Sequence, residues 1–261
     1  MIPGLQAVVF DWAGTMIDFG SRAPVVALCK VFAAEGVPIE ESEARADMGM
    51  AKSDHIAAIL RIPRVRAAWV VAHGAEPDGA TVDRLFAAIG PMMREAAAEC
   101  TVLIPGAADI VAKLRAAGVK IGSCTGYTRE MMADILPAAA AQGYAPDVLV
   151  CAGDTATGRP SPLMLWKNLV ELGAWPASAC VKVDDAPVGI AEGLGAGVWT
   201  IGIAASGNGV GLSAEALAAL PEDERAARIA ASRAVLEAAG AHLVIDTVAD
   251  LPEALARLAI G

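Results

Sequence analysis

Residues 6–15 read QAVVFDWAGT, a short apolar run from Gln6 to Phe10 that ends at Asp11. A run of β-branched and aromatic residues that is apolar at successive positions is typical of a parallel strand buried on both faces. In doubly wound sheets the functional site forms beyond the carboxyl ends of the strands. The stretch therefore predicts a first strand over 6–10 that delivers Asp11 to an active-site edge.

The chain after residue 106 alternates between helix and strand patterns. Helices are predicted at 107–117, at 129–141 and, from an N-cap at Ser161 with Pro162 in the first turn, up to Gly173. Further strands are predicted at 119–123, 147–151, 179–183, 198–203 and 242–245. Strand-helix units of this length imply a parallel sheet with helices on both faces.

Residues 21–100 have a different pattern, because their apolar positions recur at helical spacing in 25–32, 56–60 and 82–89 and no convincing strand interrupts them. This all-helical block follows the first strand and precedes the rest of the sheet. The predicted fold class is therefore α/β, a doubly wound parallel sheet with an inserted helical cap. Residues 1–20 and 101–261 form the predicted core, and residues 21–100 form the cap.

The composition limits the partners and the compartment. A net charge of −10 disfavours nucleic acid and anionic membranes, so an anionic substrate must be bound by local positive groups. No apolar run approaches the roughly 18 residues of a membrane span, and the start lacks the features of a signal peptide. We expect a soluble, cytoplasmic protein. Five scattered cysteines without C-x-x-C spacing indicate reduced thiols rather than disulfides or a zinc site.

Four sets of polar residues fall at predicted strand ends or in the following loops. They are Asp11 to Thr15, Thr125-Gly126, Gly158-Arg159-Pro160 and Asp184-Asp185. An ionised Asp on a tight turn can attack phosphorus, with N–H groups stabilising the phosphoryl oxygens. Mg²⁺ needs only one or two carboxylates from the protein, and Asp11 and Asp185 are the natural ligands. Together the sets predict a magnesium-dependent phosphoryl-transfer site.

Each of these residues also has a simpler interpretation. Asp11 alone could cap a turn, Asp184-Asp185 could form a solvated turn, and Arg159 could be a surface arginine. All four sets occur in this order at predicted strand ends, which favours the functional interpretation.

The four sets resemble the four motifs of the haloacid dehalogenase superfamily, over essentially the whole chain. The resemblance implies a Rossmann-like core with a helical cap, Asp11 as the nucleophile and Arg159 as its cationic partner. It also implies Mg²⁺ bound by Asp11, the backbone carbonyl of Ala13 and Asp185, with Asp184 as a further candidate. The acid expected a few residues after Asp185 is missing, which leaves the surroundings of the metal open.

Most phosphatases of the superfamily have a second Asp two residues after the nucleophile, and this chain has Ala13 there. An oxygen leaving group would lose its proton donor, which is typically worth about a hundred- to ten-thousand-fold in rate. A carbon leaving group instead needs an electron sink, which a lysine Schiff base supplies. The segment Met48 to His55 resembles the phosphonoacetaldehyde hydrolase branch, and its lysine aligns with Lys52.

That branch implies hydrolysis of the carbon-phosphorus bond of phosphonoacetaldehyde, with Thr125, Gly126, Arg159, Met48, His55 and Tyr127 around the substrate. Lys52 could otherwise be a surface lysine, and His55, Met48 and Tyr127 could serve only packing or capping. The resemblance also implies a homodimer formed through the cap. Two rival functions are a general phosphomonoesterase or sugar-phosphate phosphatase on the same fold, and a catalytically silent binding or regulatory relative.

Overall fold

The computed structural model describes residues 4–260, with the side chains of 97–99 left out of the description. Residues 1–3 and 261, which the prediction assigns to the core, lie outside the described residues. A single parallel sheet of six strands runs through the core in the order β3-β2-β1-β4-β5-β6. The strands are β1 (Ala7–Phe10), β2 (Lys120–Thr125), β3 (Val148–Cys151), β4 (Cys180–Asp184), β5 (Trp199–Ile203) and β6 (Leu243–Ile245). The predicted doubly wound α/β fold is confirmed, and its strand order is that of Rossmann sheets.

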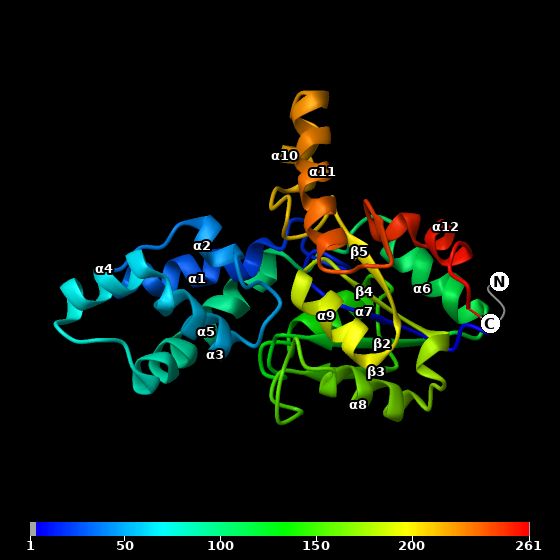
Figure 1. The fold of residues 1–261 in the computed structure, drawn as a ribbon, viewed down its shortest axis with the longest axis horizontal. Helices are drawn as coiled ribbons and strands as arrows, with labels where there is room; N and C mark the ends of the chain where they lie inside the picture. The colour runs from blue at the N-terminus through cyan, green and yellow to red at the C-terminus, as the bar shows by residue number, and fades with distance from the viewer. Residues whose placement is uncertain (1–3, 261) are drawn as a thin grey trace.

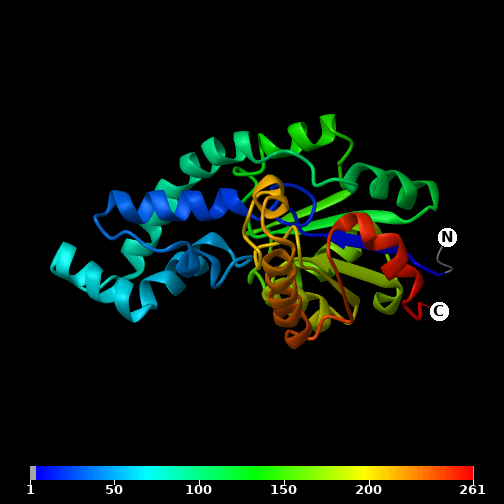
Figure 2. The same cartoon turned by 90° about the horizontal axis from the view of Figure 1, so that it is seen from above.

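Helices cover both faces of this sheet (Figure 1). The helices of the core are α6 (Ala107–Ala116), α7 (Ile135–Ala141), α8 (Leu163–Leu172), α9 (Pro187–Ala196), α10 (Ala214–Ala218), α11 (Glu222–Ala238) and α12 (Leu251–Ala256), with short 3-10 turns η1 (Ala177–Ala179) and η2 (Val248–Asp250). Helix α11 projects from the core beside the cap, as Figures 1 and 2 show.

The two faces of β1 belong to different apolar cores. Val8 and Phe10 pack in one cluster with Ile110 of α6, while Val9 packs in another with Leu165 of α8. None of the β1 residues is exposed. Burial on both sides explains why the strand is apolar at every position.

The cap consists of five helices that lie to one side of the core (Figures 1 and 2). They are α1 (Arg22–Ala34), α2 (Glu41–Arg45), α3 (Lys52–Arg61), α4 (Pro63–His73) and α5 (Gly79–Glu99). Buried apolar side chains of α1 and α5, among them Phe32, Leu85 and Ile89, continue the first core cluster into the cap. No helix of the described residues is long and apolar enough to cross a membrane. No disulfide joins cysteines within the part of the chain that the structure describes, and Cys124, Cys151 and Cys180 are buried.

Two predicted helix starts differ from the structure. The helix predicted at 129–141 begins only at Ile135, and the preceding residues form turns. Pro137 explains this, because a proline ring clashes with the carbonyl four residues earlier unless it lies in the first turn. Helix α8 begins at Leu163 with Pro162 as N-cap, although the Ser161 hydroxyl does accept a bond from the Leu163 N–H at 3.4 Å.

Candidate active site

The sheet brings the predicted polar sets to one edge. Strand β1 pairs with both β2 and β4, and Phe10 lies opposite Ser123 and Val183. The residues that follow in each strand are therefore neighbours, so Asp11 lies between the ends of β2 and β4. This point, where the strand order reverses, is the ligand site of doubly wound sheets.

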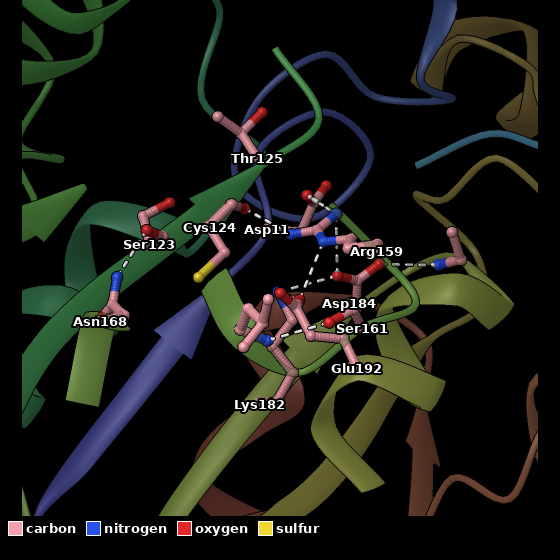
Figure 3. A network of polar contacts seen from close by, with 12 residues as sticks. Asp11, Ser123, Cys124, Thr125, Arg159, Ser161, Asn168, Lys182, Asp184 and Glu192 are labelled. Carbon is pink, nitrogen blue, oxygen red and sulfur yellow. Dashed lines mark hydrogen bonds and ion pairs between the residues drawn. The ribbon is translucent and has the colours of Figure 1, made fainter. Parts of the chain in front are cut away.

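Arg159 connects these strand ends (Figure 3). Its Nη1 lies 2.6 Å from Asp11 Oδ1, its Nη2 donates to the Cys124 carbonyl at 2.6 Å, and its Nε donates to Glu192 Oε2 at 2.9 Å. The side chain is 1% exposed. Since all three nitrogens are bonded, the guanidinium has a single orientation toward Asp11.

A second buried cation, Lys182, lies behind Arg159 and was not foreseen from the sequence. Its Nζ is 2.9 Å from Asp184 Oδ2 and 3.4 Å from Glu192 Oε2, and all three side chains are fully buried. Space for them depends on α9, because a Cβ at Gly189 would overlap the Asp184 carboxylate and a Cβ at Gly193 would lie 3.0 Å from Lys182 Cβ. The only sequence feature that could have indicated this buried cation was a lysine inside an otherwise apolar predicted strand.

The three aspartates of the site differ in their electrostatics. Burial and then the charge of Asp184 raise the pKa of Asp11 to about 6, against the opposing effect of Arg159. Burial, Asp11 and Asp184 raise the pKa of Asp185 well above its usual value. The charges of Lys182 and Arg159 outweigh burial and lower the pKa of Asp184. Asp11 and Asp185 thus lack enough positive charge around them, whereas Asp184 is neutralised by protein groups.

This set of carboxylates fits a divalent cation. Oxygens of Asp11, Asp184 and Asp185 lie within 4.8 Å of one another. Asp185 is oriented by the Thr15 hydroxyl at 3.3 Å and by the Asn208 N–H at 2.7 Å. Hard oxygen ligands in this number suit Mg²⁺, and its charge would offset the repulsion between the carboxylates.

The cap contributes Lys52, the first residue of α3, whose side chain is only 2% exposed. Its Nζ lies 5.5 Å from the centroid of the Tyr127 ring. Burial lowers the pKa of Lys52 to about 8, with Asp11 opposing this effect and Arg159 adding to it. A lysine in this environment is far more nucleophilic at neutral pH than a surface lysine.

Lys52 and Asp11 line the same cavity between cap and core, which has a volume of about 20 Å³. The other lining residues are Ala13, Ser21, Pro24, Met48, Gly49, Thr125, Gly126, Tyr127, Asp185 and Ala186. Arg159 and Asp184 are not among them. Most of the predicted site residues are therefore brought together at one cavity.

His55 has a different position from the other candidates. It is fully buried and does not line the cavity, and neither ring nitrogen has a hydrogen-bond partner among the described residues. Burial and then the Lys52 charge lower its pKa to about 3, slightly opposed by the nearby backbone of Ala44. The imidazole is therefore neutral. Trp12 is also buried and packs against the Tyr144 ring, with 4.8 Å between centroids.

Comparison with known proteins agrees with this geometry. The family model for haloacid dehalogenase-like hydrolases matches residues 5–197, and the chain belongs to that family. Among curated relatives, the phosphonoacetaldehyde hydrolase of Paraburkholderia xenovorans (strain LB400) is 50% identical over 261 residues, covering 98% of each chain. That of Hahella chejuensis (strain KCTC 2396) is 47% identical, covering 96% of this chain and 85% of its own.

A solved structure extends the likeness to three dimensions. The crystal structure of a phosphonoacetaldehyde hydrolase-like protein from Oleispira antarctica superimposes with a TM-score of 0.97 at 42% identity, covering 98% of this chain and 93% of that one. These relatives confirm the predicted resemblance and the prediction that the chain is an enzyme.

Proposed function

We propose that this chain hydrolyses the carbon-phosphorus bond of phosphonoacetaldehyde to give acetaldehyde and phosphate. The observation that carries the proposal is that a buried lysine of the cap and the strand-end aspartate of the core, Lys52 and Asp11, line one cavity. Both groups are needed, because a carbon leaving group requires an electron sink and phosphorus requires a nucleophile. The names of the relatives support the same substrate.

Lys52 supplies the electron sink. Its neutral amine adds to the aldehyde and loses water to give an imine, which is protonated on nitrogen before the carbon-phosphorus bond breaks. With a pKa of about 8 instead of 10.5, the neutral fraction at pH 7 rises from about 1 in 3,000 to about 1 in 10. Burial of Lys52 therefore raises the neutral fraction of its amine at pH 7 by roughly 300-fold.

Asp11 attacks phosphorus while the electron pair of the carbon-phosphorus bond moves into the imine, giving an enamine. Arg159, fixed by Glu192 and the Cys124 carbonyl, orients the Asp11 carboxylate. Protonation of the enamine carbon and hydrolysis of the imine release acetaldehyde. Water then cleaves the aspartyl phosphate.

We assign the Mg²⁺ ligands to Asp11, the Ala13 carbonyl and Asp185, which all line the cavity, whereas Asp184 is paired with Lys182. The bound ion would neutralise the phosphoryl oxygens as charge develops on them.

The small cavity also has a consequence for access. About 20 Å³ accommodates roughly one water molecule, so the substrate enters only when the cap moves away from the core. We propose that residues 21–100 move as one unit on the core of 1–20 and 101–261. A cap-mediated homodimer remains a prediction, which the solution mass of the protein will test.

The two rival functions are less well supported. A phosphomonoesterase needs a proton donor for an oxygen leaving group, and Ala13 has none. A silent binding protein has no need for a lysine whose pKa is lowered beside a carboxylate and an arginine.

Borohydride trapping tests the proposal directly. The protein is incubated with phosphonoacetaldehyde, reduced, and analysed by peptide mass spectrometry together with phosphate release in the unreduced sample. We expect an added ethyl group on Lys52 where cleavage precedes reduction, and a phosphonoethyl group where it does not. Lys52→Arg should abolish both label and phosphate, while Lys30→Arg, an exposed cap lysine, should leave both unchanged. Phosphate release without a Lys52 adduct would sink the imine mechanism.

A further inference from the structure

Arg45, the last residue of α2, reaches from the cap to the core. Its Nη1 donates to the Gly20 carbonyl and to Asn208 Oδ1, each at 3.0 Å, and its Nη2 donates to the Gly211 carbonyl at 3.0 Å. Its side chain is 16% exposed. One guanidinium thus bonds the linker into the cap and a loop of the core.

Asn208 returns this contact and extends it to the site. Its Nδ2 donates to the Arg45 carbonyl at 3.1 Å, and its backbone N–H donates to Asp185 Oδ2 at 2.7 Å. Asn208 is therefore in direct contact with both the cap arginine and the carboxylate that we assign to Mg²⁺.

Two of the backbone carbonyls that Arg45 contacts belong to glycines. Gly211 has a φ of +71°, and a Cβ there would lie 2.8 Å from Arg45 Cζ. Gly20 has a φ of +89°, and a Cβ there would overlap the Leu212 carbonyl. The absence of a side chain at Gly211 thus lets the guanidinium approach that backbone, and at Gly20 it lets the linker lie against Leu212.

The cap segment that follows Arg45 is also tightly fitted to the core. A Cβ at Gly126 would lie 2.5 Å from the Met50 carbonyl oxygen, and a Cβ at Gly49 would lie 2.7 Å from Val188 Cγ2. This segment leads directly to Lys52. The contacts of Arg45, Gly49 and Gly126 therefore hold the start of α3, and with it Lys52, against the core.

We propose that Arg45 and Asn208 form a clasp that stabilises the closed cap and couples cap closure to the position of Asp185. Both are positioning residues, since neither lines the cavity. Because such coupling is reciprocal, binding of Mg²⁺ at Asp185 should favour the clasped cap, and clasping should strengthen Mg²⁺ binding. The roles of Lys52 and Asp185 in this inference rest on the proposed function.

The first test compares Arg45→Met with Arg66→Met, since Arg66 is a cap arginine whose ion pair with Glu76 stays within the cap. Hydrogen exchange of residues 15–21 and 207–212, and Mg²⁺ affinity by calorimetry, are measured without substrate. Loss of charge-assisted bonds predicts about tenfold faster exchange and about tenfold weaker Mg²⁺ binding in Arg45→Met only. Wild-type exchange and affinity in Arg45→Met would overturn the clasp.

A second set of variants covers the case in which Arg45→Met does not fold. Arg45→Lys keeps the charge but cannot reach all three acceptors. We therefore expect exchange to become faster and Mg²⁺ binding weaker, each by less than in Arg45→Met. Asn208→Ala should weaken Mg²⁺ binding, and the double variant should add little to either single one, because both remove the same coupling. Full additivity would contradict a joint action.

Kinetics then separate positioning from general destabilisation. Arg45→Met should lower kcat/KM by about tenfold at limiting Mg²⁺ and regain most of it at saturating Mg²⁺, since the cation favours the closed cap, and Arg45→Lys should show a smaller loss with the same recovery. A loss that Mg²⁺ does not restore would assign Arg45 a structural role only. If even the wild type releases no phosphate from phosphonoacetaldehyde, the proposed function fails while exchange and calorimetry still decide the clasp.

Discussion

The Nε atom of Arg159 lies 2.9 Å from Oε2 of Glu192, and both side chains are shut off from solvent. Glu192 also lies 3.4 Å from Lys182 Nζ, so one carboxylate stands between two buried cations. Asp11 is therefore oriented by an arginine that is itself fixed by Glu192. Removal of this carboxylate leaves positive charge uncompensated in the interior, which is costly.

Glu192→Gln keeps the shape of the side chain and removes its charge. Breaking a buried ion pair of this kind typically costs about 3–5 kcal/mol, which corresponds to roughly a 10 °C fall in Tm for a chain of this size. Thermal unfolding measured by calorimetry checks this. Glu171→Gln, which alters an exposed pair with Lys167, is the matched control and should leave Tm nearly unchanged. Equal Tm values for the two variants would contradict the prediction.

The pH profile of kcat/KM should report Lys52. Its lowered pKa means that the amine becomes neutral as pH rises through about 8, so the rate should increase up to that pH and then level off. Asp11, with a pKa of about 6, also gains its charge as pH rises, so it adds to the increase near pH 6 and causes no fall at higher pH. Steady-state rates from pH 6 to pH 10 at saturating Mg²⁺ test this. If kcat/KM continued to rise up to the usual lysine pKa, burial would not lower the pKa of Lys52.

Asp185→Asn should have opposite effects on the stability of the folded protein in the absence and in the presence of Mg²⁺. The raised pKa of Asp185 means that the unfolded chain releases this proton at lower pH than the folded protein, so stability is lost as pH rises above the usual Asp value. The neutral amide removes that loss, so the metal-free variant should be more stable than the wild type at pH 7.

Mg²⁺ should reverse the order. A ligand at a hundred times its Kd stabilises a protein by about 2.7 kcal/mol, which only the wild type should gain. Melting curves of both proteins with EDTA and with excess Mg²⁺ make the comparison, with Asp223→Asn on α11 as an exposed control. Equal stabilisation of all three proteins by Mg²⁺ would place the ion elsewhere.

His55 should make the protein sensitive to acid. The pKa of His55 in the folded protein is about 3, below its usual 6.5. Between these two values the unfolded chain binds a proton that the folded protein does not bind, so stability falls as pH drops from about 6.5 toward 3. At pH 5 the loss is about 2 kcal/mol. His55→Leu should lack it, so the difference in unfolding free energy between variant and wild type should change by this amount between pH 7 and pH 5. Parallel pH curves would contradict the prediction.

The positions of Asp11, Thr125 and Asp185 could be predicted from the sequence because each follows a recognisable strand, and parallel strands end at a common edge. Lys52 could not be identified in this way, since its helix pattern is ordinary and only family resemblance distinguished it. Burial of its ammonium depends on the approach of the cap to the core, which is a long-range property.

The ion-pair partners of Arg159 could not be predicted from local sequence patterns for a similar reason. Lys182 lies inside a correctly predicted strand and Glu192 lies on the following helix, but their pairing depends on how closely α9 approaches β4. That distance is set by Gly189 and Gly193, which a periodicity argument treats only as weak helix formers. Arg45 and Asn208, 163 residues apart, are linked by the same kind of long-range contact.

The central position of β1 in the sheet protects Asp11 from local unfolding of the molecule. Sheets lose their outer strands first in local unfolding, and β3 and β6 are the outer strands here. Asp11 follows the strand that has two paired neighbours and two apolar cores against it. Fraying at either edge therefore leaves Asp11 in place, and its position is expected to be lost only when the core itself melts.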